Sequence, residues 1–140
     1  MVIKEHFDIT SDIRSVLIIQ LGDIGDVVWT TPSIWAVKEA FPEANVSVLL
    51  REGAGCLLES DPALHRIFEV WQDKGRFVEN AISQINLIRN LRREQFDLVF
   101  DLRSDERGAF MSLLTGAPIR ASLFYKDVPF WRNRMFTQLI

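Results

Sequence analysis

Apolar residues along the chain follow two alternating patterns, one typical of buried strands and one typical of helices. Short runs of consecutive apolar, β-branched residues predict strands, as in Val16-Leu17-Ile18-Ile19. Longer segments with apolar residues at helical spacing separate these runs. The pattern predicts strands over residues 15–20, 45–50, 66–70, 96–101 and 119–124. It predicts helices over residues 27–41, 52–58, 77–93 and 106–114, and a further helix that begins near Pro129 and is unfinished at the last residue.

Two of the predicted helices carry additional signals. Pro32 lies inside the first one and removes a backbone donor, so we expect a kink or a late helix start there. The helix over residues 77–93 is strongly amphipathic. Its predicted buried side consists of Ile82, Ile85, Leu87, Ile88 and Leu91.

Alternation of strands and helices predicts an α/β fold. We expect one Rossmann-like domain over residues 1–140, with a parallel sheet of about five strands, helices on both faces and right-handed crossovers. Ligands of such folds bind beyond the carboxyl ends of the strands. This rule directs attention to the loops at residues 21–26, 51–55 and 101–107.

Composition narrows the class of protein. Of the 140 residues, 48% are hydrophobic and 25% are charged, which is typical of a globular domain and unlike a disordered chain. The apolar runs are far shorter than the ~20 residues of a membrane span, and residues 1–12 lack the apolar core of a secretory signal. The single cysteine, Cys56, excludes an internal disulfide and a cysteine-cluster zinc site and favours a cytoplasmic location. A net charge of −3 gives no indication of nucleic-acid binding.

The last part of the sequence, residues 120–140, is both basic and aromatic. Four basic residues against one acidic residue give it a charge of +3, and it contains five aromatic side chains. Such a segment can contact phosphates or a membrane surface. The interpretation that we favour is a helix whose apolar side packs on the domain.

The loop after the first strand carries the most information about function. Gly22 and Gly25 allow a sharp turn and a close approach to a ligand. The spacing G-x-x-G-D is neither the dinucleotide fingerprint nor a Walker motif, and its two acidic residues would repel a pyrophosphate. Asp26 stands at the start of the next helix. It can serve as an N-cap, as an ionised general base, or as both.

Several short motifs occur in a fixed order over about residues 14–137. They are Gly25-Asp26, Thr31-Pro32, Ala40-Phe41-Pro42, the turn Glu59-Ser60-Asp61-Pro62, the strand Phe96-Asp97-Leu98-Val99-Phe100-Asp101-Leu102 and the helix exit Leu114-Thr115-Gly116-Ala117-Pro118. As an ordered set, these motifs resemble glycosyltransferase family 9, the heptosyltransferases.

The resemblance implies the N-terminal, acceptor-binding half of a two-domain GT-B-type transferase. Such enzymes transfer heptose from ADP-heptose to the lipopolysaccharide core with inversion, and Asp26 matches the family's general base. The nucleotide sugar would be bound mainly by a C-terminal domain absent from this chain, so we expect little activity from the chain alone. No metal and no further cofactor are implied. A cytoplasmic enzyme with peripheral contact at the inner membrane is expected, and the uncovered functional edge could cause self-association.

The resemblance and the sheet-edge rule together select candidate substrate-binding residues. These are Gly22, Asp23, Gly25, Arg51, Asp101, Arg103 and Ser104. Arg51 and Arg103 could hold an anionic group of the acceptor. Arg103-Ser104 replaces the Gln-Gly of many family members, and Asp23 occupies a variable position without an assigned catalytic role. For Asp101, contact with the acceptor and a structural role in its loop remain equally open.

Two other functions fit parts of the pattern. A phospho-receiver signalling domain is also a five-stranded α/β unit, and Asp23, Asp26, Asp101 and Lys126 could imitate its acidic residues and lysine. However, Asp101 follows the fourth predicted strand, whereas a receiver's phosphorylated aspartate follows the third. The other alternative is a sugar- or anion-binding module without chemistry.

Overall fold

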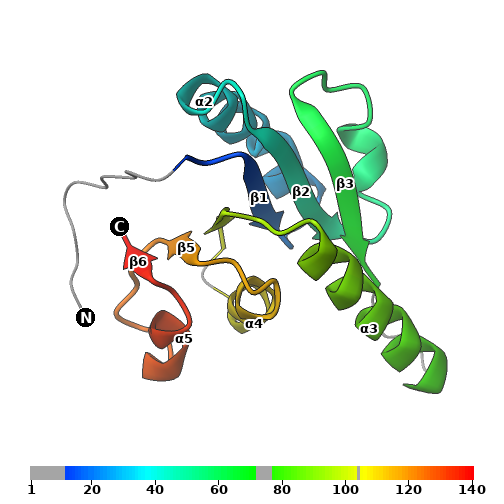
Figure 1. Ribbon diagram of the computed structural model, residues 1–140. Helices are drawn as coiled ribbons and strands as arrows, with labels where there is room; N and C mark the ends of the chain where they lie inside the picture. The colour runs from blue at the N-terminus through cyan, green and yellow to red at the C-terminus, as the bar shows by residue number, and fades with distance from the viewer. Residues whose placement is uncertain (1–11, 72–76, 104) are drawn as a thin grey trace.

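The computed structural model describes residues 12–71, 77–103 and 105–140. In these ranges the strands form one parallel sheet of six strands in the order β3-β2-β1-β4-β5-β6 (Figure 1). The strands are β1 (Ser15–Gln20), β2 (Asn45–Arg51), β3 (Leu64–Val70), β4 (Leu98–Asp101), β5 (Ile119–Ser122) and β6 (Gln138–Leu139). The predicted parallel α/β sheet is confirmed, with six strands where about five were expected.

Helices connect the strands and cover both faces of the sheet. They are α1 (Ile24–Trp29), α2 (Thr31–Ala40), the short 3-10 helix η1 (Gly55–Leu57), α3 (Phe77–Arg93), α4 (Glu106–Leu114) and α5 (Phe130–Arg134). Side chains of α1, α2 and the residues that flank η1 pack on one face of the sheet, and side chains of α3 and α4 pack on the other face. No helix among the described residues is long and apolar enough to cross a membrane.

The central strand β1 contains a run of consecutive apolar residues because both of its faces are covered. Leu17 and Ile19 point into the core beneath α3 and α4, whereas Ile18 points into the core beneath α1 and α2. All three are fully buried. A strand covered on both faces has no solvent side, so it needs no alternation of polar residues.

The first predicted helix is divided in two, as Pro32 indicated. Helix α1 ends at Trp29, and α2 begins at Thr31 with Pro32 in its first turn. Backbone N–H groups in the first turn of a helix have no intrahelical partner, so the missing N–H of Pro32 costs no hydrogen bond. The Thr30 hydroxyl at the junction donates to the backbone oxygen of Asp26 at 2.8 Å.

The predicted buried side of α3 is wrong for its first half. Leu91 is fully buried and Leu87 packs against the core, but Ile82 and Ile85 are 56% and 57% exposed. The 17-residue helix is long for the sheet, and Figure 1 shows its first turns extending past the edge. Periodicity identifies the apolar side of a helix and carries no information on how far the sheet beneath it extends.

The predicted C-terminal helix is much shorter than expected. Helix α5 ends at Arg134, and β6 follows and pairs with β5 through Ala121 and Ser122. A two-residue strand at the sheet edge is too short for any periodic signal. Packing of this basic, aromatic segment on the domain is confirmed for Arg132 and Phe136, which are both buried.

The strand order reverses between the neighbouring strands β1 and β4, which places the crevice of the fold there. After β1 the chain crosses to β2 on one side, and after β4 it crosses to β5 on the other. Ligands of doubly wound sheets bind at this reversal. The order also argues against the phospho-receiver alternative, since that class has the order 2-1-3-4-5.

Candidate functional site

The loops that follow β1 and β4 meet at the reversal of strand order and bring two charged side chains together. Nη1 of Arg103 lies 3.2 Å from Oδ2 of Asp26, although the residues are 77 positions apart in sequence. The two side chains are 41% and 50% exposed, so both remain accessible to a ligand. A salt bridge this exposed contributes little to stability, about 0–1 kcal/mol.

Asp26 occupies the first turn of α1 and not its N-cap. The helix begins at Ile24, so Asp23 is the N-cap residue, which corrects the N-cap interpretation of Asp26. Oδ2 of Asp26 accepts a hydrogen bond from the backbone N–H of Asp23 at 3.1 Å. An acidic side chain in the first turn of a helix interacts favourably with the positive end of the helix dipole.

Gly22 is required by the close approach of the two loops. A Cβ atom at Gly22 would lie 2.2 Å from Oδ2 of Asp26 and 2.7 Å from Nη1 of Arg103. Gly25 differs from this expectation, because it lies inside α1 and a Cβ there would meet no atom within 4 Å. The sharp turn attributed to both glycines is therefore not needed at Gly25.

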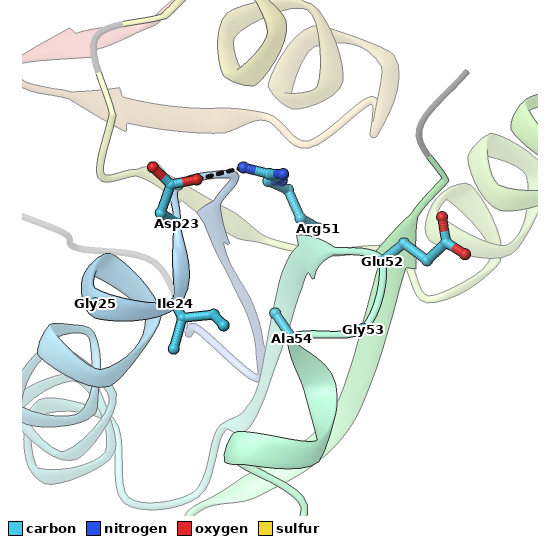
Figure 2. A pocket seen from close by; sticks show the side chains of 8 residues that line it. Asp23, Ile24, Gly25, Arg51, Glu52, Gly53 and Ala54 are labelled. Carbon is cyan, nitrogen blue, oxygen red and sulfur yellow. Dashed lines mark hydrogen bonds and ion pairs between the residues drawn. The ribbon is translucent and has the colours of Figure 1, made fainter. Parts of the chain in front are cut away.

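A cleft of about 420 Å³ opens between the ends of β1 and β2. It is lined by Gly22, Asp23, Ile24, Gly25, Arg51, Glu52, Gly53 and Ala54. Figure 2 shows Asp23 and Arg51 facing each other across its mouth, where Nη1 of Arg51 lies 2.5 Å from Oδ1 of Asp23. The side chain of Glu52 points away from this pair. The structure thus places Gly22, Asp23, Gly25 and Arg51 around one open space.

Asp101 lies under the site and not on its surface. It is 2% exposed, and its Oδ2 lies 3.4 Å from Nη2 of the fully buried Arg132. Its Oδ1 accepts from the backbone N–H of Arg103 at 3.2 Å. The carboxylate is also so close to Gly108 of α4 that a Cβ there would lie 2.5 Å from Oδ1. The burial of Asp101 fits a structural role in its loop and does not fit direct contact with an acceptor. Ser104 lies outside the described residues.

Burial raises the pKa of the Asp101 carboxyl to about 7, although the hydrogen bond from Arg103 and the charge of Arg132 lower it. An aspartate in the unfolded chain has a pKa of about 3.9. Between these values the folded chain keeps a proton that the unfolded chain has lost, so its free energy of unfolding falls as the pH rises from about 4 to about 7. Asp101→Asn, which cannot titrate, should remove this decline. Urea denaturation at pH 5 and pH 7 measures it, with the exposed Asp127→Asn as control. An unchanged pH dependence in Asp101→Asn would contradict the prediction.

Sequence reasoning missed Arg132 and Gly108, which surround the Asp101 carboxylate. Arg132 stood in the basic, aromatic segment, where nothing distinguished it from Arg134. Among the residues that the structure describes, no three His, Cys, Asp or Glu side chains lie close enough to hold a metal ion.

Comparison with known proteins finds curated proteins of similar sequence and solved structures of similar fold. No family model matches the sequence. Lipopolysaccharide heptosyltransferase 3 of Escherichia coli is 29% identical over 118 residues, which are 83% of this chain and 34% of that protein. The form from strain K12 is 27% identical over a similar span. The chain thus spans about a third of the length of the curated relatives that it matches.

Solved structures agree on the fold. A glycosyl transferase family 9 structure from Veillonella parvula has a TM-score of 0.76 and 23% identity, covering 93% of this chain and 37% of that one. E. coli heptosyltransferase WaaC with ADP has a TM-score of 0.73 and 16% identity, covering 90% of this chain and 40% of that one. The resemblance to the heptosyltransferases of glycosyltransferase family 9, which the sequence motifs indicated, is therefore confirmed over most of this chain.

Proposed function

We propose that this chain is the acceptor-binding, N-terminal half of a GT-B-type glycosyltransferase. The reaction is transfer of heptose from ADP-heptose to the lipopolysaccharide core, with inversion at the sugar carbon. Similarity to lipopolysaccharide heptosyltransferase 3 over 83% of the chain supports the reaction class. Since the chain spans 34% of that relative, the nucleotide sugar would be bound mainly by the remainder of the natural protein.

The observation that carries the proposal is the position of Asp26. Its carboxylate is half exposed, lies in the first turn of a helix and stands where the strand order reverses. As general base it would take the proton of an acceptor hydroxyl while that oxygen bonds to the anomeric carbon of heptose. The bond from this carbon to the ADP phosphate oxygen breaks on the opposite face, and ADP leaves with the electron pair. Attack from the face opposite the leaving group inverts the configuration.

Two arginines beside Asp26 favour an acceptor that carries negative charge. Arg103 pairs with Asp26, and Arg51 pairs with Asp23 on the other side of the same loop. Guanidinium groups bind phosphate and carboxylate groups through paired hydrogen bonds. A phosphate or carboxylate on the acceptor could replace either aspartate as the partner of its arginine. No metal and no cofactor besides the nucleotide sugar enter this proposal, which places the enzyme in the cytoplasm with peripheral contact at the inner membrane.

The test is a transfer assay with the natural protein that contains this sequence. The protein is incubated with ADP-heptose and lipopolysaccharide of truncated core, and mass spectrometry should detect addition of one heptose to the acceptor. A parallel reaction without ADP-heptose is the control. Acceptor binding without transfer would favour the alternative of a sugar- or anion-binding module. The absence of both would reject the proposal.

A further inference from the structure

Arg132 is the largest fully buried side chain of the described residues, and it reaches the loop that carries Arg103. Its Nη2 donates to the hydroxyl of Ser122 at 2.6 Å and to the backbone oxygen of Arg103 at 3.1 Å. The same nitrogen lies 3.4 Å from Oδ2 of Asp101. One guanidinium from α5 therefore connects the ends of β4 and β5 with the site loop.

The backbone of Arg103 is held from both sides by this buried pair. Its N–H donates to Asp101, and its carbonyl oxygen accepts from Arg132. The side chain that starts from this fixed backbone places Nη1 3.2 Å from Oδ2 of Asp26. The position of the guanidinium beside Asp26 thus depends on a residue that is itself inaccessible to any ligand.

Stability alone is a poor explanation for an arginine at this position. A buried ion pair often contributes no more than apolar side chains of similar volume, because both charges lose their hydration. Among the described residues, Nε of Arg132 has no hydrogen-bond partner, which adds a further cost. The centre of the Phe136 ring lies 4.8 Å from the guanidinium carbon, so an unbranched apolar side chain would also find packing partners. An apolar side chain could provide neither the hydrogen bonds to Ser122, Leu123 and Asn133 nor the one to the Arg103 backbone, and only the last of these reaches the site loop.

We propose that Arg132 is a positioning residue that holds the Arg103 backbone so that the Arg103 guanidinium faces Asp26. The inference rests on the proposed function, because it assigns Arg132 an effect on transfer through Arg103 and Asp26. It also predicts a structural effect, namely that the Arg103 backbone becomes less ordered when Arg132 is replaced by a residue without the guanidinium donors. The two parts can be tested separately.

The activity test uses the natural protein and a double-mutant cycle. Arg132→Met should lower kcat about 10- to 100-fold, in the range expected when a site group is displaced by about 1 Å. In an Arg103→Met background the same substitution should cost less than about twofold, because the group it positions is gone. Arg134→Met, an exposed arginine of the same helix over the Phe130 ring, should leave kcat unchanged. An equal loss in both backgrounds would reduce Arg132 to a structural residue and overturn the proposal.

The structural test does not depend on activity. Hydrogen exchange of the Arg103 amide in Arg132→Met should accelerate by about tenfold or more relative to Arg134→Met, with exchange in β1 unchanged. Arg132→Lys keeps the charge without the planar fork and should give an intermediate rate, so it remains informative if the methionine variant fails to fold. Unchanged exchange at Arg103 in the lysine and methionine variants would overturn the proposal. Accelerated exchange in a natural protein that transfers no heptose would reject only the proposed function.

Discussion

Asp26→Asn should lower the turnover number of the natural protein about 10²–10⁴-fold, the usual contribution of a positioned general base. Asparagine has nearly the same shape and keeps an oxygen that can accept the hydrogen bond of the Asp23 N–H. It cannot accept the proton of an attacking hydroxyl. Acceptor binding should therefore change little, so that KM for the acceptor stays within about a few-fold while kcat falls.

Steady-state kinetics with ADP-heptose and a truncated lipopolysaccharide acceptor measure this effect. Asp127→Asn is the matched control, since Asp127 is an exposed residue in the segment between β5 and α5. Full turnover in Asp26→Asn would exclude Asp26 as the base. A loss of acceptor binding with unchanged kcat would assign Asp26 to substrate binding instead.

Gly22→Ala should also lower turnover strongly, by about 10²-fold, although Gly22 has no reacting atom of its own. The added methyl would stand 2.2 Å from Oδ2 of Asp26, so the carboxylate must move. It would also stand 2.7 Å from Nη1 of Arg103, which blocks movement toward that side. The substitution thus displaces the proposed base without removing it.

The same kinetic assay, with circular dichroism to confirm folding, tests this prediction. Gly25→Ala is the comparison, because its methyl would meet no atom within 4 Å, and we expect a much smaller loss. Equal losses in both variants would show that chain flexibility and not the displacement of Asp26 is responsible. An active Gly22→Ala would mean that the two loops separate during the reaction.

The local elements could largely be predicted because their signals lie within a few residues. The run from Val16 to Ile19 identified a strand buried on both faces, and the structure has β1 at residues 15–20. The spacing of apolar residues over 77–93 identified α3 with the same bounds as the structure. Pro32 indicated the break between α1 and α2, because proline favours the first turn of a helix.

The candidate site could be predicted only loop by loop. The sheet-edge rule selected the loops of Asp26, Arg51 and Arg103, and the structure places all three at the same edge. Which groups pair across those loops was beyond the sequence, since Asp101 and Arg103 are only two residues apart and point to different environments. One is buried with Arg132, and the other is half exposed beside Asp26.

Taken by itself, the sequence determined the alternation of strands and helices, the parallel α/β class and the motifs that resemble the heptosyltransferases. These properties depend on the period of apolar residues and on short ordered motifs, which are local. Only the tertiary structure decided that Asp26 faces Arg103, that Gly22 must lack a side chain, and that Arg132 reaches under the site from α5. Such contacts join segments far apart in the sequence, 77 residues in the case of Asp26 and Arg103, and packing of the sheet and helices brings them together. Burial then assigns their roles, because a charged group away from water must find its partner within the fold.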